Sequence, residues 1–252
     1  MKNLIIIIVC IFSQAFFGQT PNELFDQANL AFKNGQYEKS INLYNSIEKS
    51  GYQSDVLYYN LGNAYYKLNK IAPSIYNYEK SLLINPTNTD AQNNLNFAKR
   101  MAIDVIEPMP KTLFQKINES IIYSVSYNNW AIINIVFAFL SIAFFIMYFF
   151  SSFETKKRTF FVLTFVGFGL FLITLSMGIK ARHHFVNDQP AIVFEPKASV
   201  KSEPGFNSNE IFELHEGTKV QILDQIENWY KIKISDGKTG WINRNQVKKL
   251  KE

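Results

Sequence analysis

Apolar residues are concentrated in three stretches of the chain, and the segments between them mix apolar and polar positions as soluble domains do. The first stretch lies within residues 1–18, and the other two are residues 130–150 and 159–179. Each of the latter two has twenty-one residues, which is enough for a helix to cross the hydrocarbon core of a bilayer. Neither has a polar face to present to water, so both are predicted to be transmembrane helices.

Residues 1–18 have the layout of a secretory signal peptide. Lys2 precedes an apolar run from Leu4 to Phe12, and a more polar region with small residues follows. Cleavage after Ala15 and cleavage after Gly18 both fit this region. An uncleaved signal anchor is the competing interpretation, although the apolar run is short for a membrane span.

The loop between the two predicted spans is residues 151–158, so the spans are expected to form an antiparallel hairpin. Its basic triplet, residues 156–158, places the loop in the cytoplasm by the positive-inside tendency. Export of the N-terminus gives the same topology, whereas Lys180 and Arg182 after the second span oppose it mildly. We therefore expect a bacterial inner (cytoplasmic) membrane protein with two spans and both soluble domains in the periplasm.

An internal repeat of thirty-four residues occupies the region 21–104. The two copies are residues 21–54 and 55–88, and residues 89–104 are predicted to form a capping helix. Positions one period apart carry side chains of similar size: Ala28 and Gly62, Ser40 and Ser74, Tyr44 and Tyr78. These residues resemble tetratricopeptide repeats, in which small residues lie where two helices cross and large aromatic residues fill the space between them.

The resemblance implies a groove that binds a peptide or a partner helix and is lined by the first helix of each repeat. Its candidate residues are Asn29, Phe32, Lys33, Asn63, Tyr66 and Lys67. The alternative is that these side chains are solvated or packing residues of a spacing element. Phe25, Tyr59 and Asn93 stand where a carboxylate-binding lysine would be expected, so capture of a C-terminal carboxylate is not predicted.

A juxtamembrane linker, residues 105–129, connects the repeats to the first span. Pro108 and Pro110 interrupt any helix there, and a short amphipathic stretch follows at residues 113–123. We expect this stretch near the membrane surface, with Trp130 as an interfacial anchor.

The C-terminal region, residues 190–252, alternates apolar and polar residues in short runs separated by turn residues, which is typical of a small all-β domain. The order of these runs resembles a bacterial SH3-like domain, a type that often binds cell-wall peptide or another protein. Core packing is the first interpretation of Trp229 and Tyr230, and a ligand-binding surface is the second. The runs are residues 198–204, 214–223, 229–234 and 236–242.

Charge and composition argue against nucleic-acid binding and catalysis. The net charge is +5, but residues 19–129 carry ten basic and ten acidic side chains and residues 180–252 carry twelve and ten. No folded region therefore has the dense basic face that binds phosphates. Cys10 is the single cysteine, and no catalytic motif or metal-ligand spacing occurs. We predict a protein that is not an enzyme and that needs no cofactor or metal.

The fold expected is multidomain: an all-α tetratricopeptide solenoid, a two-helix transmembrane hairpin and a small all-β SH3-like barrel. This order of segments resembles the BatE proteins of the Bacteroides aerotolerance (Bat) group, found in Bacteroidetes and related bacteria. The resemblance implies sister membrane proteins with von Willebrand A domains as partners, a neighbouring MoxR-type ATPase, and a link to oxidative stress. We therefore predict an envelope scaffold. The alternative is a peptidoglycan-binding accessory protein that uses its SH3-like domain.

Overall fold

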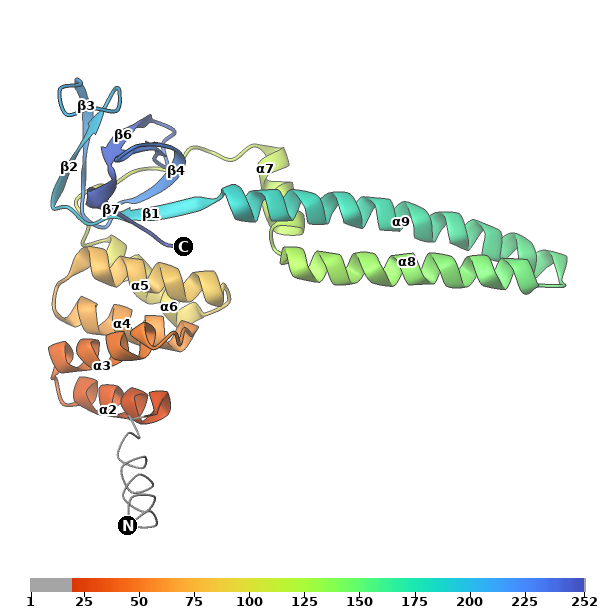
Figure 1. Cartoon of the computed structure of the whole chain (residues 1–252), viewed down its shortest axis with the longest axis horizontal. Helices are drawn as coiled ribbons and strands as arrows, with labels where there is room; N and C mark the ends of the chain where they lie inside the picture. Colours follow the sequence, from red (N-terminus) through yellow and green to blue (C-terminus); the bar gives the residue numbers. More distant parts are fainter. Residues whose placement is uncertain (1–19, 252) are drawn as a thin grey trace, which may run out of the picture. The chain divides into compact units, whose positions relative to one another are not determined.

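The computed structural model describes residues 20–251, so the predicted signal peptide lies outside the described residues. These residues form two compact units (Figure 1). One unit is discontinuous in sequence and combines residues 20–107 with residues 190–251. The other is Pro108–Gln189.

Five helices form the first part of the discontinuous unit, and each packs against the next along the chain. Side-chain oxygens of Thr20, Ser54 and Asn88 cap three of the helices by accepting hydrogen bonds from backbone N–H groups of the first turn. The amphipathic spacing of their apolar residues buries one face of each helix against its neighbours. The helices are α2 (Pro21–Lys33), α3 (Tyr37–Lys49), α4 (Asp55–Lys67), α5 (Ile71–Ile84) and α6 (Thr89–Lys99).

Small and large residues complement each other where α4 crosses α5. A Cβ atom added to Gly62 would lie 2.6 Å from two ring carbons of Tyr78, so only glycine permits this approach. Ser74 Oγ donates a 3.0 Å hydrogen bond to the carbonyl oxygen of Gly62. The small residues that define the sequence repeat therefore set the distance between these helices.

Seven antiparallel strands and a short 3₁₀ helix make up the C-terminal barrel, with the sheet order β3-β2-β6-β5-β4-β1-β7. Alternating side chains of these strands enter one apolar core, which includes Val200, Leu214, Tyr230, Ile232 and Ile242. The elements are β1 (Gln189–Val193), β2 (Lys197–Lys201), β3 (Glu210–His215), β4 (Lys219–Ile226), β5 (Trp229–Lys233), β6 (Thr239–Asn243), η2 (Arg244–Gln246) and β7 (Val247–Lys249).

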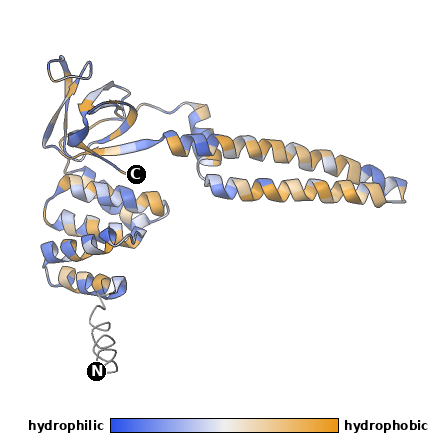
Figure 2. Cartoon of the chain, in the orientation of Figure 1, coloured by the Kyte–Doolittle hydropathy of each residue, from blue (hydrophilic) through white to orange (hydrophobic). Residues whose placement is uncertain are grey.

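The second unit contains two long apolar helices, α8 (Tyr127–Phe150) and α9 (Glu154–Asn187), which pack against each other. Both are long and apolar enough to cross a membrane, and most of their side chains are exposed, unlike those of a core helix. Figure 2 shows both helices hydrophobic over most of their length and hydrophilic at the turn between them. A short helix, α7 (Leu113–Ile117), continues into the π-helical turn η1 (Asn118–Ile122) ahead of α8.

The helix boundaries differ from the expectation at four places. The first is the start of α8 at Tyr127, ahead of the predicted start at residue 130. The predicted loop 151–158 is helical from Glu154 onward, and α9 continues past residue 179 to Asn187. Lys and Arg are good helix formers, so the charged residues that flank the apolar run prolong the helix beyond it. The predicted capping helix 89–104 ends at Lys99, and an irregular segment follows.

Polar groups connect the two apolar helices. Asn134 Nδ2 donates to the carbonyl oxygen of Phe171 at 2.7 Å and to Thr174 Oγ1 at 3.1 Å. Ser141 Oγ donates to the carbonyl oxygen of Thr164 at 3.0 Å. These contacts satisfy polar groups that would otherwise face an apolar environment, and they fix the register of the hairpin.

Candidate functional site

Asparagine side chains form a ladder across the first helices of the repeats. Asn29 Oδ1 accepts hydrogen bonds from the hydroxyl group of Tyr44 at 2.5 Å and from Asn60 Nδ2 at 3.1 Å. One repeat later, Asn63 Oδ1 accepts hydrogen bonds from the hydroxyl group of Tyr78 at 2.6 Å and from Asn94 Nδ2 at 2.8 Å. The arrangement therefore recurs with the period of the sequence repeat.

The ladder orients the two amide groups of Asn29 and Asn63. In both residues the oxygen is occupied by two donors, so the nitrogen points away from them. Neither nitrogen makes a hydrogen bond within the part of the chain that the structure describes, and both side chains are only half-buried. The N–H groups are therefore free to donate to an incoming acceptor, such as a main-chain carbonyl oxygen.

The other candidate groove residues divide into packed and exposed ones. Phe32 is half-buried and lies edge-on to Tyr37, with ring centroids 5.3 Å apart. Tyr66 is half-buried against the apolar cluster of α5 and α6. Lys33 and Lys67 are exposed at the last turns of α2 and α4. Binding by these residues stays a prediction, and the geometry favours the asparagines and lysines over the two aromatic residues.

Sequence reasoning missed Asn60 and Asn94, which hold the ladder together. They lie one period apart, and each follows its partner asparagine by 31 residues. A comparison of polar positions at that spacing would have found them.

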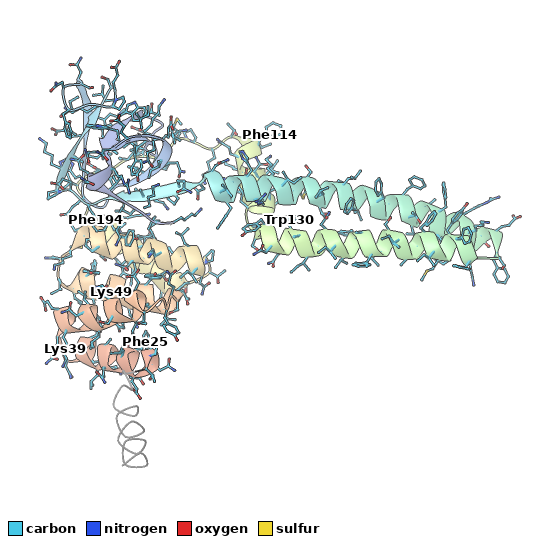
Figure 3. The ribbon with its side chains drawn as sticks, in the orientation of Figure 1. Phe25, Lys39, Lys49, Phe114, Trp130 and Phe194 are labelled. Carbon is cyan, nitrogen blue, oxygen red and sulfur yellow. The ribbon has the colours of Figure 1, made fainter. Side chains whose placement is uncertain are left out.

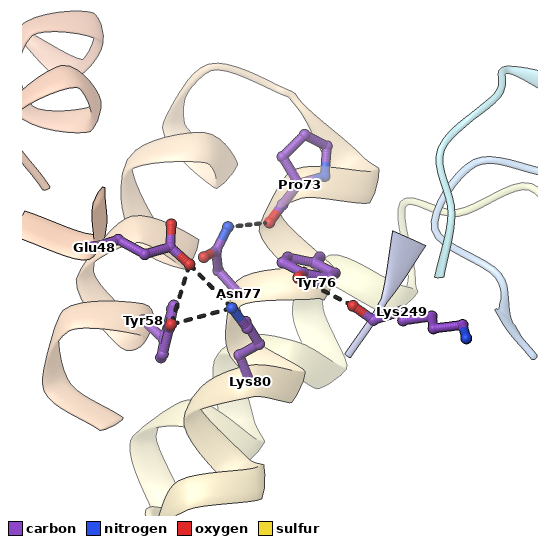
Figure 4. Close-up of polar contacts among 7 residues, drawn as sticks. All are labelled: Glu48, Tyr58, Pro73, Tyr76, Asn77, Lys80 and Lys249. Carbon is purple, nitrogen blue, oxygen red and sulfur yellow. Dashed lines mark hydrogen bonds and ion pairs between the residues drawn. The ribbon is translucent and has the colours of Figure 1, made fainter. Parts of the chain in front are cut away.

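A second polar cluster joins three neighbouring helices of the solenoid (Figure 4). Lys80 Nζ donates to Glu48 Oε1 at 3.0 Å and to the hydroxyl oxygen of Tyr58 at 3.1 Å. The hydroxyl group of Tyr58 in turn donates to Glu48 Oε1 at 3.1 Å. This cluster therefore links α3, α4 and α5.

The barrel docks on the segment that follows α6 through the carboxylate of Asp104. This carboxylate accepts hydrogen bonds from the backbone N–H of His215 at 2.7 Å, from His215 Nδ1 at 2.7 Å and from Thr218 Oγ1 at 2.6 Å. Partial burial raises the pKa of Asp104, but the hydrogen bonds from Thr218 and His215 outweigh it and hold the pKa below the ordinary 3.8. The charged form therefore stabilises the docking.

Glu79 forms a second polar contact between helix and barrel. Its side chain is 8% exposed and pairs with Lys219 Nζ at 2.6 Å and with Lys99 Nζ at 2.9 Å. Burial raises the pKa of Glu79, but the ammonium groups of Lys219 and Lys99 outweigh it and hold the pKa below the ordinary 4.5. The negative charge of this nearly buried carboxylate is thus balanced by Lys99 of the solenoid and Lys219 of the barrel.

Apolar residues complete the docking surface. Ile192 and Leu250 of the barrel belong to the same buried cluster as Ile75 and Leu95 of the solenoid. Gly217 precedes β4 with a φ of +87°, and a Cβ there would lie 2.9 Å from the side chain of Ile75. The barrel thus covers an apolar face of α5 and α6, a function that was expected of the predicted capping helix alone.

Tyr76 lies in the same interface. Its hydroxyl group donates a 3.1 Å hydrogen bond to the carbonyl oxygen of Lys249 (Figure 4). Its ring packs edge-on against Phe194, with centroids 5.6 Å apart. The last strand, β7, is therefore attached to α5 by a hydrogen bond, and the residue that follows β1 packs on the same tyrosine.

Trp229 and Tyr230, considered for a ligand-binding surface, are buried to 7% and 4% exposure. Tyr230 belongs to the barrel core, and Trp229 lies edge-on to Phe206 with centroids 5.2 Å apart. Phe206 itself is 78% exposed. Burial favours the packing interpretation of both predicted residues, and it makes Phe206 the aromatic side chain that a ligand can reach.

The described residues contain no cluster of three or more His, Cys, Asp or Glu side chains that could hold a metal ion. Residues 56–88 match the tetratricopeptide repeat family, and residues 196–248 match the bacterial SH3 domain family. No curated protein matches the chain. Both families are typically non-catalytic interaction modules, so the chain has parts suited to binding proteins or cell wall. The predicted fold class is confirmed: helical repeats, two long apolar helices and an all-β SH3 domain occur in one chain.

Proposed function

We propose that this chain is a membrane-anchored scaffold of the bacterial envelope that binds partner proteins through its tetratricopeptide repeats. The observation that carries the proposal is the asparagine ladder, which presents the amide nitrogens of Asn29 and Asn63 from two neighbouring helices. Donors repeated at the spacing of the helices suit the main-chain carbonyl oxygens of an extended segment. The exposed Lys33 and Lys67 beside them favour a segment that carries acidic side chains.

The docking of barrel and solenoid supports the membrane arrangement. Asp104 lies before the apolar helices α8 and α9, and His215 lies after them, yet their side chains are in contact. Two parts of one folded unit must be on the same side of a membrane, so the intervening chain crosses it an even number of times. A two-span hairpin meets this condition. The basic residues 156–158 favour a cytoplasmic turn and hence periplasmic domains.

The finer proposal is membership of a Bat/MoxR-type assembly linked to aerotolerance or oxidative stress. It is supported by the order of segments, which resembles that of BatE proteins. The partners proposed on this basis are sister membrane proteins with von Willebrand A domains.

Site-specific photocrosslinking in native membranes tests the scaffold. A crosslinker in place of Lys33 or Lys67 should form adducts with envelope proteins that have large ectodomains, whereas one in place of the exposed Lys39 on α3 should not (Figure 3). Asn29→Ala and Asn63→Ala should each reduce adduct yield about five-fold, the effect of one hydrogen bond of about 1 kcal/mol. Asn42→Ala, an exposed asparagine on α3, is the matched control. Equal yields at Lys39 and Lys67 would contradict a specific binding face.

Cell-wall binding is the second candidate, because Phe206 is exposed beside Trp229 in a domain that matches the bacterial SH3 family. The full chain in detergent can be mixed with purified sacculi and sedimented. Retention that is lost in Phe206→Ala would favour this candidate, and no retention would favour the scaffold alone.

A further inference from the structure

The turn end of the α8–α9 hairpin contains a cavity of about 520 Å³. It is built from the end of α8 and the first turns of α9. Its lining residues are Tyr148, Glu154, Lys157, Arg158, Phe161 and Val162.

The lining has a charged part and an apolar part. Lys157 and Arg158 contribute two positive charges and Glu154 one negative charge, so the cavity carries a net charge of +1. Arg158 makes no ion pair or side-chain hydrogen bond within residues 20–251. Tyr148 and Phe161 form the aromatic wall, with ring centroids 5.6 Å apart, and Lys157 Nζ lies 5.4 Å from the centroid of Tyr148.

The position of the cavity along the helices matches the boundary of a bilayer. On one side it adjoins the turn at residues 151–153, which contains two serines, and on the other the uncharged run of α9. Phe161, Val162 and Phe165 belong to this run, come after the two cations along α9, and have exposed side chains. A ligand that fills the cavity therefore meets cations at one end and hydrocarbon at the other.

We propose that this cavity binds the phosphodiester headgroup of an anionic glycerophospholipid. The guanidinium group of Arg158 offers paired donors to phosphate oxygens, and Lys157 adds a second cation. A phosphodiester charge of −1 balances the net charge of the lining. The apolar wall contacts the start of an acyl chain, which inorganic phosphate lacks, and basic pockets at membrane surfaces bind such headgroups. This inference rests on the proposed membrane location of the hairpin.

The test is native mass spectrometry of the full chain released from nanodiscs that contain equal amounts of phosphatidylglycerol and phosphatidylcholine. The wild-type chain should retain phosphatidylglycerol in preference. Arg158→Ala and Lys157→Ala should each lower the retained phosphatidylglycerol about five-fold, because each removes a hydrogen bond to the phosphate that contributes about 1 kcal/mol. Glu154→Gln should raise retention, because it removes the only carboxylate in the lining.

Lys156→Ala is the matched control. It removes the same charge one position away, but Lys156 does not line the cavity and its Nζ lies 5.0 Å from the ring centroid of Phe153. Retention should stay near the wild-type value. Equal losses in Lys156→Ala and Arg158→Ala would show unspecific attraction and overturn the site, as would displacement of the lipid by millimolar inorganic phosphate. A wild-type chain that does not enter nanodiscs at all would overturn the proposed membrane location together with the site.

Discussion

The carboxylate of Asp104 accepts a 2.7 Å hydrogen bond from Nδ1 of His215, which lies 111 positions further along the chain. The same carboxylate also binds the backbone N–H of His215 and the hydroxyl group of Thr218. Asp104 follows the last helix of the solenoid, whereas His215 ends strand β3 of the barrel. The tetratricopeptide and SH3 modules are therefore parts of one folded unit and not independent domains on a tether.

Asp104→Ala should loosen the barrel from the solenoid. It removes three hydrogen bonds to one charged group, and we expect a loss of about 2–3 kcal/mol in the free energy of unfolding. Thermal unfolding and hydrogen exchange of the detergent-solubilised chain measure this loss, with faster exchange expected in β3 and α5. Glu107→Ala, an exposed carboxylate nearby in sequence, is the control. Unchanged exchange in β3 would contradict the role given to Asp104.

The docking should weaken in acid. The pKa values of Asp104 and Glu79 in the folded chain lie below their ordinary values of 3.8 and 4.5. A carboxyl group whose pKa is lowered by folding contributes its full stabilisation at pH values above its ordinary pKa. It loses this stabilisation as the pH falls through its pKa in the folded chain. The free energy of unfolding should therefore depend little on the ionisation of these two groups above about pH 5, and it should fall below about pH 4. Acid titration followed by hydrogen exchange tests this.

The double variant Asp104→Asn, Glu79→Gln identifies the origin of that acid dependence. It should be less stable at neutral pH, and its stability should fall less on acidification than that of the unmodified chain. A parallel fall in both proteins would assign the acid sensitivity to other carboxyl groups.

Much of the fold could be predicted from the sequence because its signals are local or periodic. The thirty-four-residue period revealed the repeats, and the alternation of apolar and polar residues revealed the strands. The docking could not be predicted this way. Glu79 and Lys219 are 140 positions apart, and a single pair of opposite charges at that separation leaves no periodic trace. The sequence also does not reveal that the ring of Phe206 lies against that of Trp229.

Gly62→Ala should destabilise the solenoid although alanine is the better helix former. The added Cβ would overlap the ring of Tyr78, which is fully buried and cannot move aside without disturbing its neighbours. Overpacking of this kind costs about 1–3 kcal/mol, more than the gain in helix propensity of about 1 kcal/mol. Gly169→Ala, a helical position with open space around it, should cause no such loss in the same thermal unfolding experiment.

Asn134→Leu should weaken the pairing of the two apolar helices. It removes hydrogen bonds to the carbonyl oxygen of Phe171 and to Thr174 Oγ1. Interhelical hydrogen bonds in a membrane contribute about 0.6 kcal/mol on average and about 1.7 kcal/mol at most. Steric trapping in bicelles measures a change of this size. Ile132→Leu, at an exposed position of α8, should leave the pairing unchanged.

The discontinuous unit imposes an order on biosynthesis. The ribosome completes α5 and α6 before it makes the hairpin, and the strands that will cover Ile75 and Tyr76 emerge last. Until then the nascent solenoid carries an open apolar face, and Asp104 and Glu79 lack their partners from the barrel. In that interval the face is open to the barrel of another copy, so exchange of barrels between nascent chains is the misassembly that this architecture exposes the protein to.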